Sequence, residues 1–303
     1  MYRWQVRFVI PGVRLSRALD IDNMRIEPGG LDAKGRPQAR VAVHLMYTEC
    51  VREDQVRADA VQRIEHLETA ASLVCATGRT YVESLLLENR DELLAAGRPT
   101  PVGLVSSIPI EVNVPILEPE RLEHVHRALK RLRLDTLLAV QRALRWINRR
   151  YEEEDAYDRY ISLWIAFTTL YDRCDQSEQD QIEKFIKDTF TADAAMSALD
   201  RGFAASAVDL LASSGLMLGR GKRNVSEELG AMVKAYRSSH ADPQAVLATL
   251  ALTLYALRND LVHGRHSGSQ NRQEIAVLHA ASGILVSLMY RALHIMISLP
   301  PRG

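Results

Sequence analysis

Residues 160–171 read YISLWIAFTTLY, and this segment decides the fold of the second half of the chain. Wound as a helix, it places apolar side chains on every side, which is typical of a central helix buried among others. From Pro119 onward the apolar residues recur with a helical period, so residues 119–303 are predicted to form an all-α helical domain. We expect helices over residues 119–130, 134–150, 155–172, 178–190, 193–213 with a break, 226–238, 243–263 and 272–299.

The first 118 residues have a different pattern. Apolar and polar side chains alternate from Arg3 to Ile10 and again from Val41 to Tyr47, which indicates strands with one buried face. The connection between them, rich in Gly, Pro and Asp, has the composition of a loop from Pro28 to Pro37. A helix is expected over residues 56–74, and further strands over residues 81–87, 102–106 and 110–117. Residues 1–118 are therefore predicted to form an α+β domain, whose role no motif indicates.

Composition and charge describe a globular chain without a global electrostatic field. The 303 residues are 47% hydrophobic, and 38 basic residues balance 38 acidic ones, so attraction to nucleic acid has to come from local patches. The N-terminus lacks the pattern of a secretory signal, and Arg291 and His294 interrupt the most apolar stretch, residues 284–297. We therefore expect a cytoplasmic protein without a membrane span. Free core thiols in a reducing compartment are expected at Cys50, Cys75 and Cys174.

Residues 250–266 are the most informative about function. One leucine stripe of the expected helix should face the core of the domain, and Asn259 and His263 point almost directly away from it. A second face of this kind suits a partner subunit or a cleft. Arg258 projects about 140° from His263, so the two side chains diverge within one chain and can converge across a twofold axis. The stripe consists of Leu250, Leu254, Leu257 and Leu261, and Leu252 and Tyr255 share the second face.

The segment Arg258-Asn259-Asp260-Leu261-Val262-His263 resembles the Arg-x4-6-His motif of the HEPN-domain family, in its Arg-Asn-x-x-x-His form. We refer to it below as the motif. Together with the segment Ser162 to Tyr171, which includes the helix from Trp164 to Tyr171, it is similar to the Apea-like branch of that family. The resemblance covers roughly residues 130 to 298 and implies a HEPN-like helical bundle in a homodimer that forms through the helix bearing the motif.

The resemblance implies a metal-independent endoribonuclease, and the chemistry of the residues is compatible with it. The RNA 2′-hydroxyl attacks the neighbouring phosphate, leaving a cyclic phosphate and a 5′-hydroxyl. Histidine has an ordinary pKa of about 6.5, so His263 suits general acid and base catalysis, and the planar fork of Arg258 suits charge on phosphoryl oxygens. Asn259 is expected to orient His263 or bind a phosphate oxygen. Asp260 either fixes the tautomer of His263 or is a solvated surface carboxylate.

A second interpretation of the motif stays open. Arg258 can be an ordinary surface cation, and a histidine followed by Gly264 is also typical of a helix C-terminus. The corresponding function is a non-catalytic dimeric module that binds RNA, a nucleotide or a protein. Family members often carry a carboxylate where Thr168 stands, so this chain offers no third catalytic group there.

Residues 127–150 contain eight basic residues and one acidic residue, Asp135, a net charge of +7. Such a run predicts salt-sensitive phosphate contacts, although charged runs are usually solvated helix faces. The RNA-binding candidates are Arg142, Arg145, Arg149 and Arg150, with Arg265 in the loop after the motif. We expect no metal and no cofactor, because no phosphate loop or Cys/His pattern is present. The resemblance implies RNA and a regulatory protein as partners, and a setting in cellular defence or a toxin–antitoxin pair.

Overall fold

The computed structural model describes residues 2–32, 35–75, 84–89, 99–101, 116–171, 177–200, 203–218, 223–263 and 272–298. Contacts divide the chain into two units, and the division falls between Arg133 and Leu134. The first unit mixes helices and strands, and the second is helical, as the two sequence patterns predict. The predicted boundary after residue 118 differs from this division, because the helix that follows it packs in the first unit.

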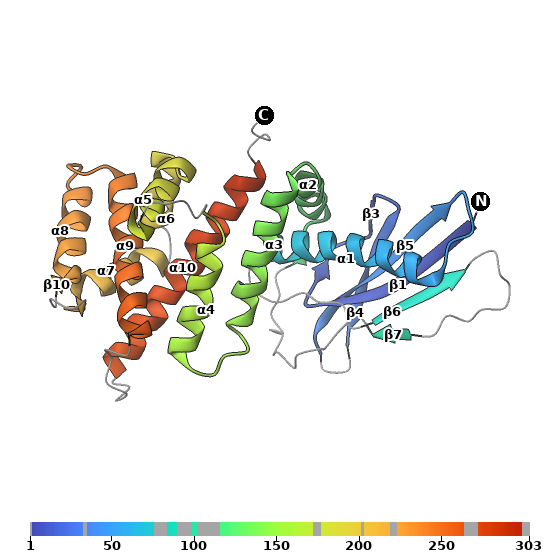
Figure 1. Ribbon diagram of the computed structural model, residues 1–303, viewed down its shortest axis with the longest axis horizontal. Helices are drawn as coiled ribbons and strands as arrows, with labels where there is room; N and C mark the ends of the chain where they lie inside the picture. Colours follow the sequence, from blue (N-terminus) through green and yellow to red (C-terminus); the bar gives the residue numbers. More distant parts are fainter. Residues whose placement is uncertain are drawn as a thin grey trace. The chain divides into compact units, whose positions relative to one another are not determined.

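The first unit contains a six-stranded sheet in which all paired strands are antiparallel, in the order β3-β4-β5-β1-β6-β7. A separate parallel pair joins β2 and β8. The strands are β1 (Tyr2–Pro11), β2 (Arg14–Leu15), β3 (Leu19–Ile21), β4 (Met24–Leu31), β5 (Pro37–Tyr47), β6 (Ser84–Asn89), β7 (Pro99–Pro101) and β8 (Ile116–Leu117). The helices are α1 (Glu53–Cys75) and α2 (Pro119–Lys130), and α1 runs across the sheet (Figure 1).

The core of the first unit follows from the alternation of β1 and β5. Val6 lies opposite Val43 and Phe8 opposite Val41, and all four side chains are buried. Since successive side chains point to opposite faces of a strand, Arg7 is exposed. Helix α1 contributes a buried stripe to this core, and α2 packs against α1. The stripe of α1 includes Val56, Ala60, Ile64 and Leu67.

The segment from Pro28 to Leu31 was expected to be a loop and instead belongs to β4. Backbone hydrogen bonds hold it to β5, and the register shifts between Pro28 and Leu31, as at a bulge. Glycine suits this place for two reasons. Gly30 has a φ of +75°, and a Cβ on Gly29 would lie 2.8 Å from the carbonyl oxygen of Gln38. The expectation of a loop was therefore wrong for residues 28–31, because main-chain pairing with β5 decides the structure here and composition does not show it.

Over its described residues, the second unit consists of helices with one short strand pair. The helices are α3 (Leu134–Arg149), α4 (Ala156–Thr168), α5 (Glu178–Thr189), α6 (Ala192–Asp200), α7 (Phe203–Ser213), α8 (Val225–Arg237), α9 (Pro243–Val262) and α10 (Arg272–Ser298), and the pair is β9 (Met217–Leu218) with β10 (Arg223–Asn224). The break expected within residues 193–213 separates α6 from α7. Local caps fix several helix starts: the side chain of Asp155 accepts from Tyr157 N, and that of Asp242 accepts from Ala245 N.

Helix α4 is the buried helix that the opening segment predicts. Tyr160, Trp164 and Phe167 are at most 1% exposed, and α4 packs against both α3 and α10. Aromatic rings continue this core, because the ring centroids of Trp164 and Phe167 lie 5.3 Å apart and those of Phe167 and Phe185 lie 5.6 Å apart. The all-round apolar pattern therefore does place this helix in the interior.

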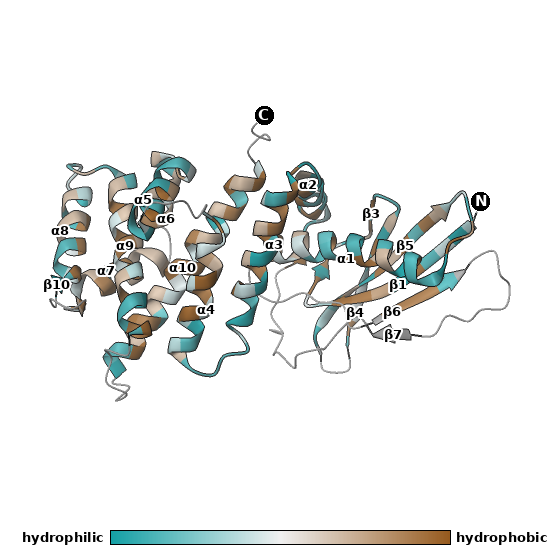
Figure 2. Cartoon of the chain, viewed as in Figure 1, coloured by the Kyte–Doolittle hydropathy of each residue, from teal (hydrophilic) through white to brown (hydrophobic). Residues whose placement is uncertain are grey.

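Helices α9 and α10 are long and apolar enough to cross a membrane by length and composition alone. About half of the apolar window of each helix, 50% in α9 and 56% in α10, is buried inside the unit. Hydrophobic residues follow one another along much of α10 (Figure 2). Because the core helix of a soluble protein has these same properties, the structure is compatible with a soluble protein.

Two further expectations concern cysteines. Cys75 is buried in α1, where burial raises the pKa of its thiol to about 11. Cys50 is exposed between β5 and α1, so the expectation of a core thiol was wrong at this position. Cys174 lies outside the described residues.

Candidate functional site

The motif occupies the last turn of α9 in the second unit (Figure 1). The predicted stripe faces the core, since Leu250, Leu254 and Leu257 are at most 2% exposed, while Leu261 is only partly buried. The helix packs against α5, α6 and α8 and also contacts α4. The motif therefore lies at the end of a helix that is well packed within the second unit.

Arg258 and Asn259 are both half-buried, and they contact each other. Arg258 Nη1 donates a hydrogen bond of 2.8 Å to Asn259 Oδ1. The side-chain oxygen of Asn259 therefore holds the guanidinium, and the predicted roles of Asn259, orienting His263 or binding a phosphate oxygen, stay predictions. A fixed guanidinium keeps its remaining N–H groups available in one orientation.

Tyr160 anchors the turn of α9 that precedes Arg258. Its hydroxyl, on α4, donates a hydrogen bond of 2.7 Å to the main-chain oxygen of Leu254. Burial raises the pKa of Tyr160 well above its usual value, and the positive charge of Arg258 opposes this change. The sequence pattern identified Tyr160 only as a core residue. An aromatic residue with a polar end, in a segment apolar on every side, is the signal that a buried hydrogen bond is needed.

His263 is exposed at the C-cap of α9. Its backbone N–H donates a hydrogen bond of 3.0 Å to the main-chain oxygen of Asn259, which closes the last turn. Within the described residues, the structure gives the His263 side chain no hydrogen-bond or ion-pair partner. Its position away from the leucine stripe agrees with the helical geometry, and its ring is accessible to a ligand in solvent.

Asp260 is the most deeply buried residue of the motif. The residue is 5% exposed, which excludes the solvated surface carboxylate that the sequence left open. Burying a carboxylate is costly unless other groups stabilise it, and Asp260 does have such interactions. Asp260 is therefore part of the folded interior of the unit.

The second face of α9 is partly covered by α4. The ring centroids of Tyr255 and Trp164 lie 5.8 Å apart, so Tyr255 packs on a core aromatic. Leu252, on the same face, is half-buried. Thr168 is 9% exposed and donates a hydrogen bond to Ile165 O at 2.8 Å. Thr168 thus bonds its own helix.

The basic run is divided between the two units, four residues in each, so its parts are described separately. In the first unit, Arg127 pairs with Glu123 at 2.5 Å and Lys130 pairs with Asp22 at 2.8 Å. These two carboxylates offset part of the positive charge from which phosphate binding was predicted. Arg131 and Arg133 are exposed.

In the second unit, Arg142, Arg145 and Arg149 are exposed on α3. Arg149 pairs with Glu153 at 3.3 Å, and its guanidinium lies 4.9 Å from the ring centroid of Trp146. Arg150 is half-buried and covers the ring of Tyr151, with 4.5 Å from the guanidinium carbon to the ring centroid. Three of the four candidates therefore present charge to solvent on one helix.

The two residues that follow the motif, Gly264 and Arg265, lie outside the described residues. Within the described ranges, no group of three or more His, Cys, Asp or Glu side chains is placed to hold a metal ion.

No model of a known protein family matches the chain, and no curated protein or solved structure is similar enough to count as a match.

Proposed function

We propose that the chain is a metal-independent endoribonuclease that acts as a homodimer, with the motif of each subunit at the active site. The observation that carries the proposal is the end of α9, where an anchored half-buried Arg258 and an exposed His263 lie five residues apart. The resemblance of this segment to the HEPN motif supports the same assignment. A role in defence or as a toxin belongs to the proposal through that resemblance, and a cytoplasmic location is part of the same proposal.

The proposed mechanism uses two groups. His263 accepts the proton of the RNA 2′-hydroxyl as it attacks the adjacent phosphorus, and a histidine of the site returns a proton to the departing 5′-oxygen. Arg258 binds the phosphoryl oxygens, whose negative charge increases in the transition state. The products are a 2′,3′-cyclic phosphate and a 5′-hydroxyl. Arg258 and His263 diverge on one helix, so the proposed site combines side chains from two subunits.

Basic side chains of α3 supply the proposed RNA contacts outside the reacting phosphate. Arg142, Arg145 and Arg149 are exposed, and arginine binds phosphate oxygens through two parallel hydrogen bonds. Contacts of this type add affinity without sequence preference and weaken as salt increases.

The test is cleavage of mixed cellular RNA in the presence of a chelator. Purified wild type is compared with Arg258→Ala and His263→Ala, and with His240→Ala as a matched control, because His240 is an exposed histidine of the same unit. Circular dichroism and sedimentation establish that each variant keeps its fold and oligomeric state. We expect cyclic-phosphate ends from wild type and from the control, and none from the two motif variants. Equal cleavage by all four proteins would refute the assignment.

The dimer is tested separately through the second face of α9. Leu252→Glu places a charge on this half-buried face, where burial in an interface would be unfavourable. We expect the variant to sediment as a monomer and to lose cleavage. A dimer that persists in this variant forms through another surface.

One observation favours a second candidate function. The His263 ring has no side-chain partner within the described residues to fix its orientation, and catalytic imidazoles usually have one. A non-catalytic dimeric module that binds RNA, a nucleotide or a protein through the same surface needs no such partner. Wild type that binds RNA but leaves it intact would favour this candidate.

A further inference from the structure

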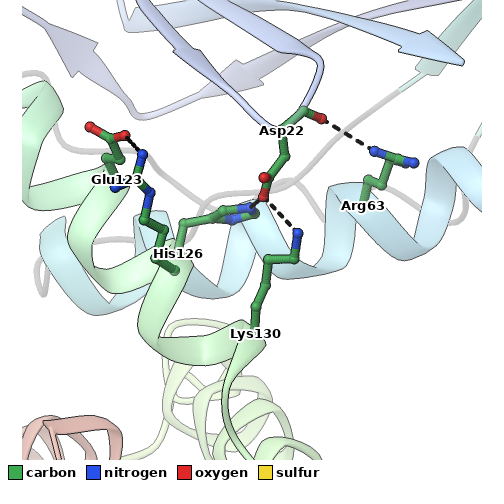
Figure 3. A network of polar contacts seen from close by, with 6 residues as sticks. Asp22, Arg63, Glu123, His126 and Lys130 are labelled. Carbon is green, nitrogen blue, oxygen red and sulfur yellow. Dashed lines mark hydrogen bonds and ion pairs between the residues drawn. The ribbon is translucent and has the colours of Figure 1, made fainter.

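The turn between β3 and β4 is held by α1 and α2 of the first unit. Asp22 and Asn23 have φ values of +48° and +62°, which forms a tight two-residue turn. Asp22 Oδ2 accepts hydrogen bonds from His126 at 3.0 Å and from Lys130 at 2.8 Å, both on α2. Arg63 of α1 donates a hydrogen bond of 3.2 Å to the main-chain oxygen of Asp22 (Figure 3). One turn residue therefore joins the sheet to α1 and α2.

His126 is almost completely buried, at 2% exposed. A carboxylate only accepts hydrogen bonds, so His126 Nε2 carries the proton and Nδ1 is bare. Nδ1 of His126 and Nδ1 of His66 on α1 are both buried without a hydrogen-bond partner among the described residues. The two rings meet edge to face, with centroids 6.3 Å apart. Two imidazoles, each with an unbonded ring nitrogen, thus lie between α1 and α2.

Burial favours the neutral form of both rings. Burial lowers the pKa of His126, Asp22 opposes this change, and the neighbouring His66 and Lys130 add to it. Burial also lowers the pKa of His66, with Lys130 adding to the change and Glu65 opposing it. The hydrogen bond from Lys130 lowers the pKa of Asp22, which is therefore charged at neutral pH. A further proton would have to occupy a buried nitrogen close to the Lys130 ammonium.

We propose that Asp22, His66, His126 and Lys130 form an acid-sensitive latch that holds α2 against α1 and the β3–β4 turn and releases it on proton uptake. An imidazolium in this position has no acceptor for its new N–H among the residues that the structure describes, and Lys130 repels it, while water would solvate it fully once α2 separates. Helix α2 ends at Lys130 and α3 begins at Leu134, so release loosens the segment that leads into the helical unit. The latch is independent of the proposed ribonuclease activity.

The test is hydrogen exchange of the full-length protein at pH 7.5 and pH 5.5, with labelling times scaled for the intrinsic exchange rates. We expect peptides of α1 and α2 to exchange about tenfold faster at the lower pH, and peptides of α4 to change little. His126→Gln keeps a donor for Asp22 and cannot titrate, and it is combined with His66→Gln. The double variant should lose the acid response, and His124→Gln, at an exposed position on the same helix, should retain it.

Three outcomes would overturn the latch. They are equal exchange of α1 and α2 at both pH values, an acid response that persists in the double variant, and a response that begins only below pH 4.5, where carboxylates titrate. A measurement on wild type guards against variants that fail to fold. In a histidine carbon–proton titration, we expect His66 and His126 to titrate below pH 6.5, together with the exchange of α2. An ordinary titration of both rings would contradict the latch as well.

Discussion

Two regions of the chain contain both a histidine and a cationic side chain, and their surroundings differ in one decisive respect. At the end of α9, His263 is exposed and the neighbouring Arg258 is bound by an uncharged amide. In the latch, His126 is 2% exposed and shares one carboxylate with Lys130. The histidine is thus accessible to a ligand in one region and enclosed by the fold in the other.

The difference separates two uses of an imidazole. A ring that reaches solvent can exchange protons with a bound substrate during each turnover, which is what general acid and base catalysis requires. A buried ring bonded to a carboxylate gains or loses a proton only when the surrounding structure changes, so its titration acts on stability. Substitution should therefore affect activity in the first region and folding in the second.

The largest effect is expected for Arg258→Lys. The substitution keeps the charge and loses the planar fork that binds two phosphoryl oxygens, and removing one such stabilising donor typically slows catalysis about a hundredfold or more. The melting temperature should change little because Arg258 is only half-buried. Single-turnover cleavage of one RNA substrate measures the rate. A variant with the wild-type rate would show that charge alone suffices, which contradicts the proposed geometry.

The second effect is a pH dependence of stability confined to the first unit. The folded-state pKa values of His66 and His126 are lowered from about 6.5 in the unfolded chain, so between the two values the unfolded state binds more protons. The free energy of unfolding therefore falls as the pH drops through 6.5, by at most about 1.4 kcal/mol per pH unit for each histidine.

Hydrogen exchange of the slowest β1 and β5 amides measures this dependence, since those strands form the centre of the sheet. The control is His263→Gln, which removes the exposed histidine and should leave the slope unchanged. If His263→Gln flattens the slope as much as His126→Gln does, then the two regions do not differ as we describe.

Much of the helical region is predictable from the sequence because its signals are local. The predicted and observed bounds of α2 coincide at Pro119 and Lys130. For α8, α9 and α10, each predicted end lies within one residue of the observed end. The apolar periodicity of a helix lies within that helix, and a cap such as Asp242 lies directly at its end. The exposed His263 and the buried leucine stripe also follow from helical geometry alone.

The features that could not be predicted depend on contacts between residues distant in sequence. The latch joins Asp22 to His126, which are 104 positions apart, through a turn whose geometry the composition does not specify. Helix α2 packs against α1, which lies far from it in the sequence, and the local pattern of α2 does not indicate this partner. Aspartate is usually a surface residue, and only the packing of α9 among α5, α6 and α8 shows that Asp260 is buried.

The third prediction concerns the anchor of the motif. Tyr160→Phe removes the hydroxyl that donates to Leu254 O and leaves the ring in place, so the second unit should lose about 1 kcal/mol of unfolding free energy. Because the bond fixes the turn before Arg258, cleavage should fall several-fold as well. Tyr255→Phe is the matched control, since Tyr255 is half-buried and packs through its ring. Denaturant unfolding and cleavage rates would contradict the anchor if both variants behaved alike.

The smallest effect is expected for Arg142→Ala, which tests whether α3 contributes to RNA binding. Arg142 is exposed, and it has no ion pair with any residue that the structure describes, so its removal should leave stability unchanged. A lost phosphate contact should weaken RNA binding a few-fold and reduce the slope of log affinity against log salt by about one. Arg52→Ala, at an exposed arginine of the first unit, is the control. An unchanged salt slope in Arg142→Ala would mean that α3 carries its charge for solvation, and that the exposed end of α9 binds RNA without it.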